Sequence, residues 1–298
     1  MRHCLFGGHP RAPGGSVLLA GVLLLTPLLT PPATAKRIDC GPPSTRTQRL
    51  SPLTRGMGEA SGLVASWQKH GVGWMIRDSG KPASIYSLRF ADGRPIVREV
   101  RVLGADNTDW EDITYSVGKD GRGRLWIIES MQKGRDPYIY EIVEPDPYNA
   151  SWVRLHMRHR FKYPGEGFQN TEASFWYDQK LVLATKSNPT HLYRFDALTG
   201  QGTHWPKYVG VLHGAPRISV LRPSPDHSAL VASDHETMSV YWGKGVGSPL
   251  EAFVGKWPAY SKTAFRGDNV EAGDYFPTGS CDVVMLSERR HVYKVFAG

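Results

Sequence analysis

The sequence has few cysteines, no long apolar segment after its first residues and no sustained helical periodicity. Of its three cysteines, Cys4 lies within the first 35 residues, so Cys40 and Cys281 remain near opposite ends of the rest of the chain. Apolar residues after residue 35 do not recur with the 3.6-residue period of an amphipathic helix. These absences exclude a helical bundle, a cysteine-rich zinc module and a protein with several spanning helices.

The common catalytic signatures are also missing. The chain has no G-x-S-x-G elbow, no G-x-x-x-x-G-K-[ST] loop and no H-E-x-x-H pair. Its 11 histidines are scattered, and His213 is the one nearest to the site predicted below. Enzymes defined by those motifs are therefore excluded, whereas a hydrolase that uses a metal ion other than zinc is still possible.

The first 35 residues have the layout of a secretory signal peptide. Arg2 and Arg11 give a positive start, residues 16–29 form an apolar run, and Ala33-Thr34-Ala35 is an A-x-A cleavage pattern. A membrane anchor is the alternative, but the run is shorter than the about 20 residues that a spanning helix needs. We therefore predict a secreted protein, or a periplasmic one in a bacterium, with a single mature domain of residues 36–298.

Export would place the two remaining cysteines in an oxidising compartment. An even number of cysteines there favours a disulfide between Cys40 and Cys281, and two free buried thiols are the alternative. Asn149-Ala150-Ser151 is the only usable glycosylation sequon, because Asn188 precedes a proline. We predict a glycan on Asn149 if the host glycosylates its secreted proteins.

Positive charge exceeds negative charge, with a formal net charge of +8 at pH 7. The densest basic stretch is Arg154–Lys162 (RLHMRHRFK). Such a stretch can bind nucleic acids or other polyanions. Because no nucleic-acid-binding motif accompanies it, a solvated strand face is the preferred interpretation, and no nucleic-acid partner is predicted.

A short motif divides residues 36–298 into five similar units. An aliphatic residue followed by tyrosine lies in a strand-like run roughly every 50 residues, a period typical of repeat folds. The five pairs are Ile85-Tyr86, Ile139-Tyr140, Leu192-Tyr193, Val240-Tyr241 and Val292-Tyr293. Aliphatic runs bounded by Gly, Pro and Asp precede each pair, as expected for antiparallel strands.

These units predict an all-β fold, a five-bladed β-propeller with four-stranded antiparallel blades. A β-sandwich is the alternative, but it would not require equal units. The last unit ends at Gly298 without an outer strand, and residues 47–54 are left over at the other end. We expect this N-terminal segment to complete the last blade and close the ring. Cys40 and Cys281 would then lie on one face of that blade, where a bond between them would lock the closure.

A glutamate precedes the first strand of four units. These residues are Glu59, Glu111, Glu172 and Glu271, and Arg217 stands near the corresponding place in the fourth unit. The first strand of a propeller blade lines the channel, so the glutamates should meet at one mouth. The second strands should leave at the same mouth, through Asp78, Glu129, Lys186, Asp234 and Glu288.

Carboxylates this close together cannot all ionise without protons or a bound cation. Ca²⁺ accepts six to eight oxygen ligands in flexible geometry, whereas Mg²⁺ needs a strict octahedron. Zn²⁺ is disfavoured because no cluster of His or Cys ligands occurs. We predict a calcium site, with Lys186, Arg217 and Glu129 available to a ligand. Its predicted ligands are Glu59, Glu111, Glu172, Glu271, Asp78 and Asp112.

Three segments resemble a group of secreted, mainly bacterial propellers described as phytase-like or esterase-like. They are Glu59-Ala60-Ser61-Gly62-Leu63, Arg77-Asp78-Ser79-Gly80 and Asn107–Ile113, and the resemblance covers residues 57–145. It implies calcium bound near the channel and an acidic rim residue at Glu129. The chain departs from the group at Lys186, which interrupts the acidic ring.

Two functions fit these features. The preferred one is a non-enzymatic binding module with a central cation and an unknown extracellular ligand. The alternative is a metal-assisted hydrolase of phosphate or carboxyl esters, in which Lys186 and Arg217 would hold phosphate. An open cleft faced by either cation would favour the enzyme, and aromatic side chains closing the mouth would favour the binding module. The glutamates could also serve only to link neighbouring blades.

Overall fold

The computed structural model describes Cys40 and residues 43–130, 136–165, 167, 169–277 and 280–297. The predicted signal peptide, residues 1–35, lies outside these residues. In the described part, no helix is long and apolar enough to cross a membrane. Regular structure there is almost entirely β, apart from one short 3₁₀ helix, Leu250–Ala252, so the all-β prediction is confirmed.

The strands form one nine-stranded sheet and three four-stranded sheets. The nine-stranded sheet contains β2 (Ala60–Ala65), β3 (Gly73–Arg77), β4 (Ser84–Ala91), β5 (Arg94–Leu103), β6 (Trp110–Val117), β7 (Gly123–Glu129), β8 (Tyr138–Val143), β9 (Trp152–Phe161) and β13 (Thr203–His204). The next sheet contains β10 (Thr171–Tyr177), β11 (Lys180–Thr185), β12 (Thr190–Arg194) and β14 (Lys207–Leu212). The third contains β15 (Val220–Pro223), β16 (Ala229–Ser233), β17 (Thr237–Trp242) and β18 (Tyr260–Thr263), and the fourth contains β19 (Val270–Tyr275), β20 (Val283–Ser287), β21 (Val292–Ala297) and β1 (Pro43–Arg49).

The nine-stranded sheet consists of two antiparallel runs, β2 to β5 and β6 to β9. Parallel pairing of β5 with β9, from Arg101↔Trp152 to Leu103↔Arg154, joins the two runs. Each run repeats the strand order of the separate sheets. The aliphatic-tyrosine pairs fall on the third strand of each run or sheet, as the repeat predicted.

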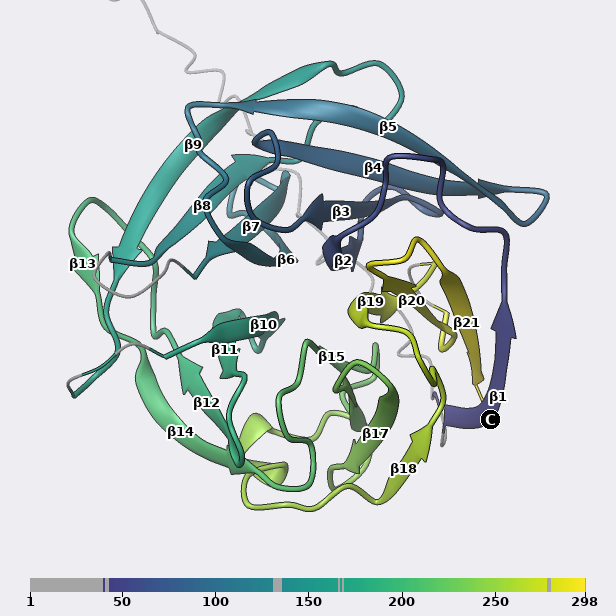
Figure 1. Ribbon diagram of the computed structural model, residues 1–298. Coiled ribbons are helices and arrows are strands. Elements are labelled where there is room, and N and C mark those ends of the chain that lie inside the picture. Colours follow the sequence, from purple (N-terminus) through teal and green to yellow (C-terminus); the bar gives the residue numbers. More distant parts are fainter. Residues whose placement is uncertain are drawn as a thin grey trace, which may run out of the picture. The chain divides into compact units, whose positions relative to one another are not determined.

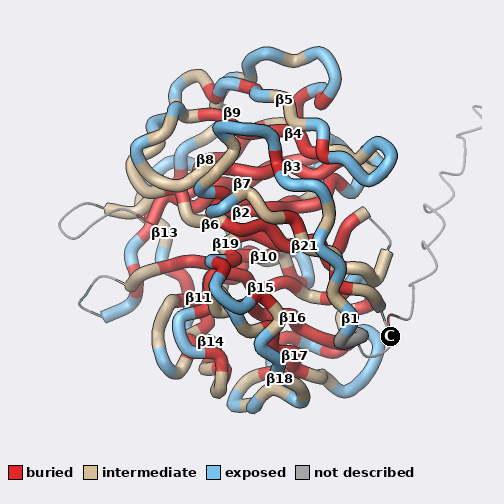
Figure 2. The backbone as a smooth tube through the Cα atoms, turned by 45° about the vertical axis from the view of Figure 1, so that its right-hand side comes forward, coloured by how far each residue is buried: buried red, intermediate tan, exposed pale blue. Residues whose placement is uncertain are grey.

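The first strands of these units surround a common axis (Figure 1). β2 contacts β6, β6 contacts β10, β10 contacts β15, β15 contacts β19, and β19 contacts β2 again. Burial falls from the axis outward: every residue of β2 is buried, whereas the outer strand β18 has none (Figure 2). This arrangement confirms a propeller-like fold.

The N-terminal strand completes the last unit. β1 pairs antiparallel with β21, from Pro43↔Ala297 to Arg49↔Tyr293. Cys40, three residues before β1, forms a disulfide with Cys281. The Cys40 N–H also donates to Asp226 Oδ2 at 3.1 Å. The predicted pairing of the two ends of the domain and the predicted disulfide are both confirmed.

Apolar side chains pack between neighbouring units rather than at the axis. Trp74 and Trp110, for example, are fully buried in the cluster between β2 to β5 and β6 to β9. Similar clusters of aliphatic and aromatic residues lie between the other neighbours. The axis is therefore left to the polar side chains of the first strands.

Candidate functional site

A β-bulge near the start of the first strand turns one side chain toward the axis in four units. The pairing of first and second strands shifts register between Ala60 and Gly62, Trp110 and Asp112, Thr171 and Ala173, and Val270 and Ala272. A bulge leaves one residue unpaired and redirects its side chain. The unpaired residues are Ser61, Glu111, Glu172 and Glu271. Three of the four predicted glutamates therefore occupy equivalent positions.

Serines take the place of glutamate in the first and fourth units. The Ser61 hydroxyl donates to Trp110 O on the next first strand, and the Ser219 hydroxyl donates to Val270 O in the same way. Glu59 and Arg217 each precede their serine by two residues, with positive φ of 61° and 57°.

Glu59 and Arg217 are both exposed, and neither lines the central pocket. The Glu59 carboxylate instead pairs with Lys81 Nζ at 2.5 Å. The sequence alignment of both residues with the other glutamates is thus off by two positions, and neither is a ligand at this site.

The second strands leave at the same mouth, in a second set of equivalent positions. In the four bulged units, the N–H of this exit residue donates to the carbonyl two residues before the bulge. In the fourth unit the equivalent residue is His235, two residues beyond Ser233, which pairs with Val220. The exit positions are therefore Asp78, Ser130, Lys186, His235 and Glu288. Asp234 and Glu129 precede the exit positions by one residue, so they are out of register with the others.

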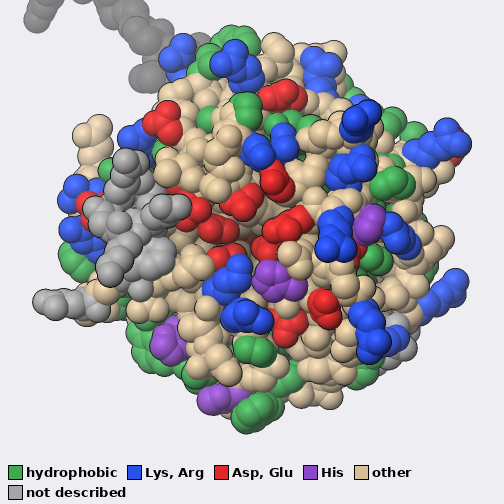
Figure 3. Space-filling view, viewed as in Figure 1, with side chains coloured by type: hydrophobic (Ala, Val, Ile, Leu, Met, Phe, Trp, Pro, Cys, Tyr) green, Lys and Arg blue, Asp and Glu red, His purple; other side chains and the backbone are tan. Residues whose placement is uncertain are grey.

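These side chains line a polar pocket of about 160 Å³ that is open to solvent. Its lining residues are Ala60, Ser61, Asp78, Ser79, Asp109, Glu111, Glu172, Lys186, Glu271 and Glu288. None of them is aromatic. Figure 3 shows Asp and Glu side chains gathered at the centre of this face, beside Lys, Arg and His side chains.

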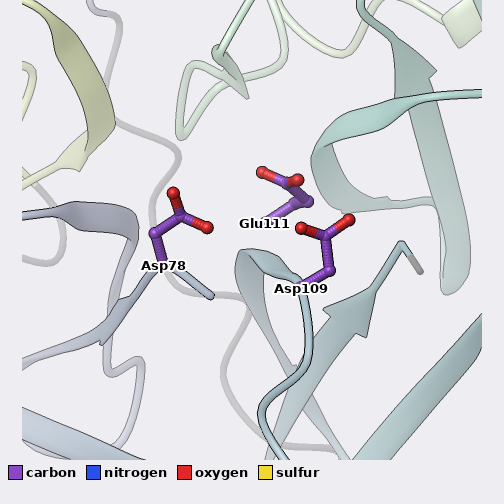
Figure 4. A group of neighbouring side chains, drawn as sticks. All are labelled: Asp78, Asp109 and Glu111. Carbon is purple, nitrogen blue, oxygen red and sulfur yellow. The ribbon is translucent and has the colours of Figure 1, made fainter. Parts of the chain in front are cut away.

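Asp78, Asp109 and Glu111 form the tightest carboxylate group in the pocket. One oxygen of each lies within 4.8 Å of the others. Asp78 follows β3, Asp109 precedes β6, and Glu111 is the second residue of β6, so the three converge from two units (Figure 4). Two oxygens bound to one Ca²⁺ at 2.3–2.6 Å lie at most about 5 Å apart, so this group could hold one ion.

Asp109 was not among the predicted ligands. Its signal in the sequence is the spacing to Glu111, because residues two apart in an extended chain lie on the same face. Asn107 holds this segment beside Asp78: its Nδ2 donates to Arg77 O at 3.0 Å and to Asp78 O at 3.2 Å. The position of Asp109 thus depends on bonds between two units.

Glu129 supports the same segment and does not line the pocket. Its Oε2 accepts the Thr108 N–H at 3.1 Å, and its Oε1 is buried without a hydrogen-bond partner among the described residues. Burial raises the pKa of Glu129 to about 7, although the Thr108 N–H opposes this. The prediction that Glu129 binds a ligand at the rim is corrected accordingly: its side chain positions a loop.

Burial and mutual repulsion raise the pKa values of the pocket carboxyls. Burial, followed by the charges of Asp78 and Glu172, raises the pKa of Asp109 to about 6. The pKa of Glu111 is raised further, first by burial and then by the charge of Glu172. Burial also raises the pKa of Glu271 to about 7, against the effect of Lys186. A bound cation would relieve this cost by favouring the ionised forms.

Two basic side chains contact the other carboxylates of the pocket. Lys186 Nζ donates to Glu172 Oε2 at 3.0 Å, and His235 Nδ1 lies 3.1 Å from Glu271 Oε1. Among the described residues, no lysine or arginine forms an ion pair with Asp78, Asp109 or Glu111. Glu172 and Glu271 therefore have basic partners at ion-pair distance, whereas Asp109 and Glu111 feel the charge of Lys186 only from further away.

Asp112, a predicted metal ligand, points away from the pocket. It follows Glu111 in the strand, and successive side chains alternate in direction. Arg222 donates to its two oxygens at 2.6 and 2.9 Å, and the Ser174 hydroxyl donates at 2.9 Å. Both oxygens are occupied inside the protein, so the structure corrects this prediction: Asp112 belongs to a buried ion pair.

Comparison with known proteins finds similarity in three-dimensional structure. No family model matches it, and no curated protein matches its sequence. The structure of glutaminyl cyclase from Myxococcus xanthus superposes with a TM-score of 0.51 at 14% identity, covering 84% of this chain and 95% of that one. A protein assigned as a gluconolactonase gives a TM-score of 0.43 at 12% identity, covering 85% and 92%. At such identities the first likeness shows the propeller fold alone.

Proposed function

We propose that this pocket binds a Ca²⁺ ion through Asp78, Asp109 and Glu111, and that the protein binds a polar ligand beside the ion. The observation that carries the proposal is the convergence of three carboxylates within 4.8 Å in a pocket open to solvent. None of the three forms an ion pair with a lysine or arginine of the described residues. Glu172 and Glu271 line the same pocket. Because they already contact Lys186 and His235, we expect them to contribute less to binding the ion.

The donor set supports calcium rather than another metal. All candidate ligands are oxygens, from carboxylates and from the Ser61 and Ser79 side chains that also line the pocket. Ca²⁺ tolerates irregular oxygen geometry and completes its shell with water, whereas Mg²⁺ requires a regular octahedron. Zn²⁺ would need His or Cys ligands, and none of the described residues that line this pocket is one.

A metal-assisted hydrolase is the second candidate, and the shape of the pocket favours it. Among the described residues, no aromatic side chain lines the mouth, and Lys186 does line it, as expected for an enzyme. A bound cation could polarise a phosphoryl or acyl oxygen and lower the pKa of a water molecule. Lys186, which pairs with Glu172, would also offset negative charge on the substrate.

Calcium titration of purified protein tests the metal site. In isothermal titration calorimetry, the parent protein should bind Ca²⁺ and Asp109→Asn should bind at least about tenfold more weakly, because an ionised ligand is lost. Glu59→Gln is the matched control, since Glu59 is acidic and two residues before the bulge but lies outside the pocket; its affinity should equal that of the parent. Absence of calcium binding by the parent, or equal losses in both variants, would reject the site.

Hydrolysis assays distinguish the two functions. Purified protein is incubated with phosphate monoesters and with carboxyl esters, in Ca²⁺ and in chelator. Turnover that requires Ca²⁺ and falls in Lys186→Met, while calcium affinity is kept, would support the hydrolase. Calcium binding without turnover of any substrate would reject the hydrolase and support the non-enzymatic binding module.

The domain and its location are part of the same proposal. We infer that the antiparallel runs β2 to β5 and β6 to β9 count as two blades, which gives five blades in one domain of residues 36–298. Residues 1–35 would direct export, in keeping with the disulfide. Asn149 is exposed, and its Nδ2 donates to Asp146 Oδ2 at 2.9 Å, so the side chain lies at the surface where the predicted glycan would be attached.

A further inference from the structure

Strand β9 has an unpaired stretch on the edge opposite β8. β5 pairs with that edge only as far as Leu103↔Arg154, and β13 pairs with it only from Thr203↔Arg160. Among the described residues, no strand pairs with residues 155–159 on this edge. The gap is about 15 Å long at about 3.3 Å per residue, which is room for a short extended segment.

A cleft of about 540 Å³ lies along this stretch. β9 provides one wall, and the segment leading into β13 provides the other. The lining residues are Leu155, His156, Met157, Arg158, Arg160, Gln201, Gly202 and Thr203. In Figure 1, β9 lies at the outside of the domain, with β13 at its end. The gap in the pairing therefore coincides with open space.

The side chains of this strand carry an alternating pattern of charge and apolar surface. Arg154, His156, Arg158 and Arg160 are exposed, whereas Leu155 and Met157 between them are half-buried. Asp106 lies 3.9 Å from Arg158, and Asp136 lies 3.3 Å from Arg160. Arg154 has no ion-pair partner in the described part of the chain, so the stripe keeps excess positive charge.

We propose that an extended acidic segment of a partner protein adds to β9 at this gap, as a strand parallel to it. Strand addition uses the free main-chain groups of an exposed edge for affinity and alternate side chains for specificity. Both strands that already use this edge, β5 and β13, run parallel to β9. Acidic residues of the partner would face Arg154 and His156, and apolar residues would face Leu155 and Met157.

The unpaired edge favours a peptide over other polyanions. A nucleic acid or an acidic polysaccharide would meet the arginines but would have no use for backbone N–H and C=O groups in extended geometry. The alternation of exposed cations with half-buried apolar residues also matches an extended peptide, whose side chains repeat every second residue. This surface is on the outer strand, so the inference is independent of the calcium proposal.

Fluorescence anisotropy with a labelled synthetic peptide tests the inference. The probe alternates glutamate and valine, and the purified full domain is titrated at low ionic strength, where surface charges are least screened. We expect Arg154→Ala and His156→Glu each to weaken binding by roughly threefold to fivefold, as for exposed charge pairs. Arg94→Ala, an exposed arginine at the far end of β5, should leave the affinity unchanged. Equal melting temperatures of all variants would show that the fold is intact.

A second probe separates strand addition from charge attraction. The same peptide with methylated backbone nitrogens keeps its charges but cannot donate hydrogen bonds to the strand edge. We expect it to bind at least about tenfold more weakly, since strand addition depends on main-chain hydrogen bonds. Equal binding of both peptides, stronger binding of an oligonucleotide or heparin than of the peptide, or no binding of the unmodified peptide would each overturn the inference.

Discussion

Replacing Arg222 with methionine should destabilise the whole domain, because this one side chain links all of the first strands. Arg222 lies on β15, and its guanidinium donates to Leu63 O on β2 at 2.9 Å, to Asp112 on β6 at 2.6 Å and to Ser174 O on β10 at 2.6 Å. Its Nε lies 3.9 Å from Asp274 Oδ1 on β19. One buried guanidinium therefore connects first strands that are not neighbours in the ring as well as those that are.

The expected loss follows from the burial of the pair. The side chains of Arg222 and Asp112 are 3% and 2% exposed. Removing one partner of a buried ion pair costs about 3–5 kcal/mol, because the other charge stays buried without compensation. In a domain of this size, each kcal/mol lowers the melting temperature by about 2–4 °C. We therefore expect Arg222→Met to melt roughly 10 °C below the parent protein.

Calorimetric melting of a double-mutant cycle measures this coupling. Arg222→Met and Asp112→Leu should each be strongly destabilising, whereas the double variant should recover part of the loss, because no charge of the pair is left unpaired. Arg217→Met, which removes an exposed arginine close by, is the control and should change the free energy of unfolding by less than about 0.5 kcal/mol. A melting temperature of Arg222→Met close to that of the parent, or a double variant equal to the sum of the singles, would refute the reasoning.

The disulfide and the pocket give two further predictions. Reducing the Cys40–Cys281 bond, which spans 241 residues, should lower the free energy of unfolding by up to about 5 kcal/mol on a chain-entropy model. Cys281→Ser should reproduce this loss and no longer respond to reductant; equal melting curves with and without reductant would contradict it. In chelator, the protein should melt at a lower temperature at about pH 8 than at about pH 5, because the raised pKa values of Asp109 and Glu271 mean that the folded state holds protons that the unfolded state has released. The stability that these protonated carboxyls contribute is lost as pH rises through about 6 to 7. Added Ca²⁺ should reduce the difference between the melting temperatures at the two pH values. A melting temperature that rises over this range in chelator would contradict the raised pKa values of the two carboxyls.

The repeat and the closure of the domain could be predicted because both are local patterns in the sequence. The aliphatic-tyrosine pairs fall on third strands. All of their side chains are buried except that of Tyr293, which is half-buried, so these strands keep an apolar signature. Cys40 and Cys281 followed from the same reasoning, since the last unit lacked one strand and the N-terminus had one to spare. Each of these inferences needed only the order of the strands.

The outer strands could not be predicted in the same detail. β5 and β9 are ten residues long, and their exposed residues are mostly polar, so their limits leave little trace in hydropathy. The parallel pairing of β5 with β9 and the short strand β13 join segments from different units. Nothing within one repeat encodes such a contact, because the partner lies outside the repeat.

The pocket shows why side chains were harder to place than strands. Glu59-Ala60-Ser61 and Glu172-Ala173-Ser174 are the same tripeptide, yet the bulge falls on Ser61 in one and on Glu172 in the other. A slip of two residues keeps every side chain on the same face of a strand, so the apolar pattern cannot reveal it. The register is set by hydrogen bonds to the second strand, which no tripeptide contains.

The residues at two positions of each unit determine where the carboxylates concentrate. Both positions lie at the mouth end of the first strand. They are the bulge residue, or Ser219 in the fourth unit, and the residue two before it. In the order of the units, the pairs are Glu59 and Ser61, Asp109 and Glu111, Asn170 and Glu172, Arg217 and Ser219, and Asn269 and Glu271. Only the second unit is acidic at both positions, and Asp78 leaves the neighbouring unit beside it. A quasi-symmetric ring of strands thus presents an asymmetric set of charges, and a single off-axis ion between the first two units is the arrangement that those charges favour.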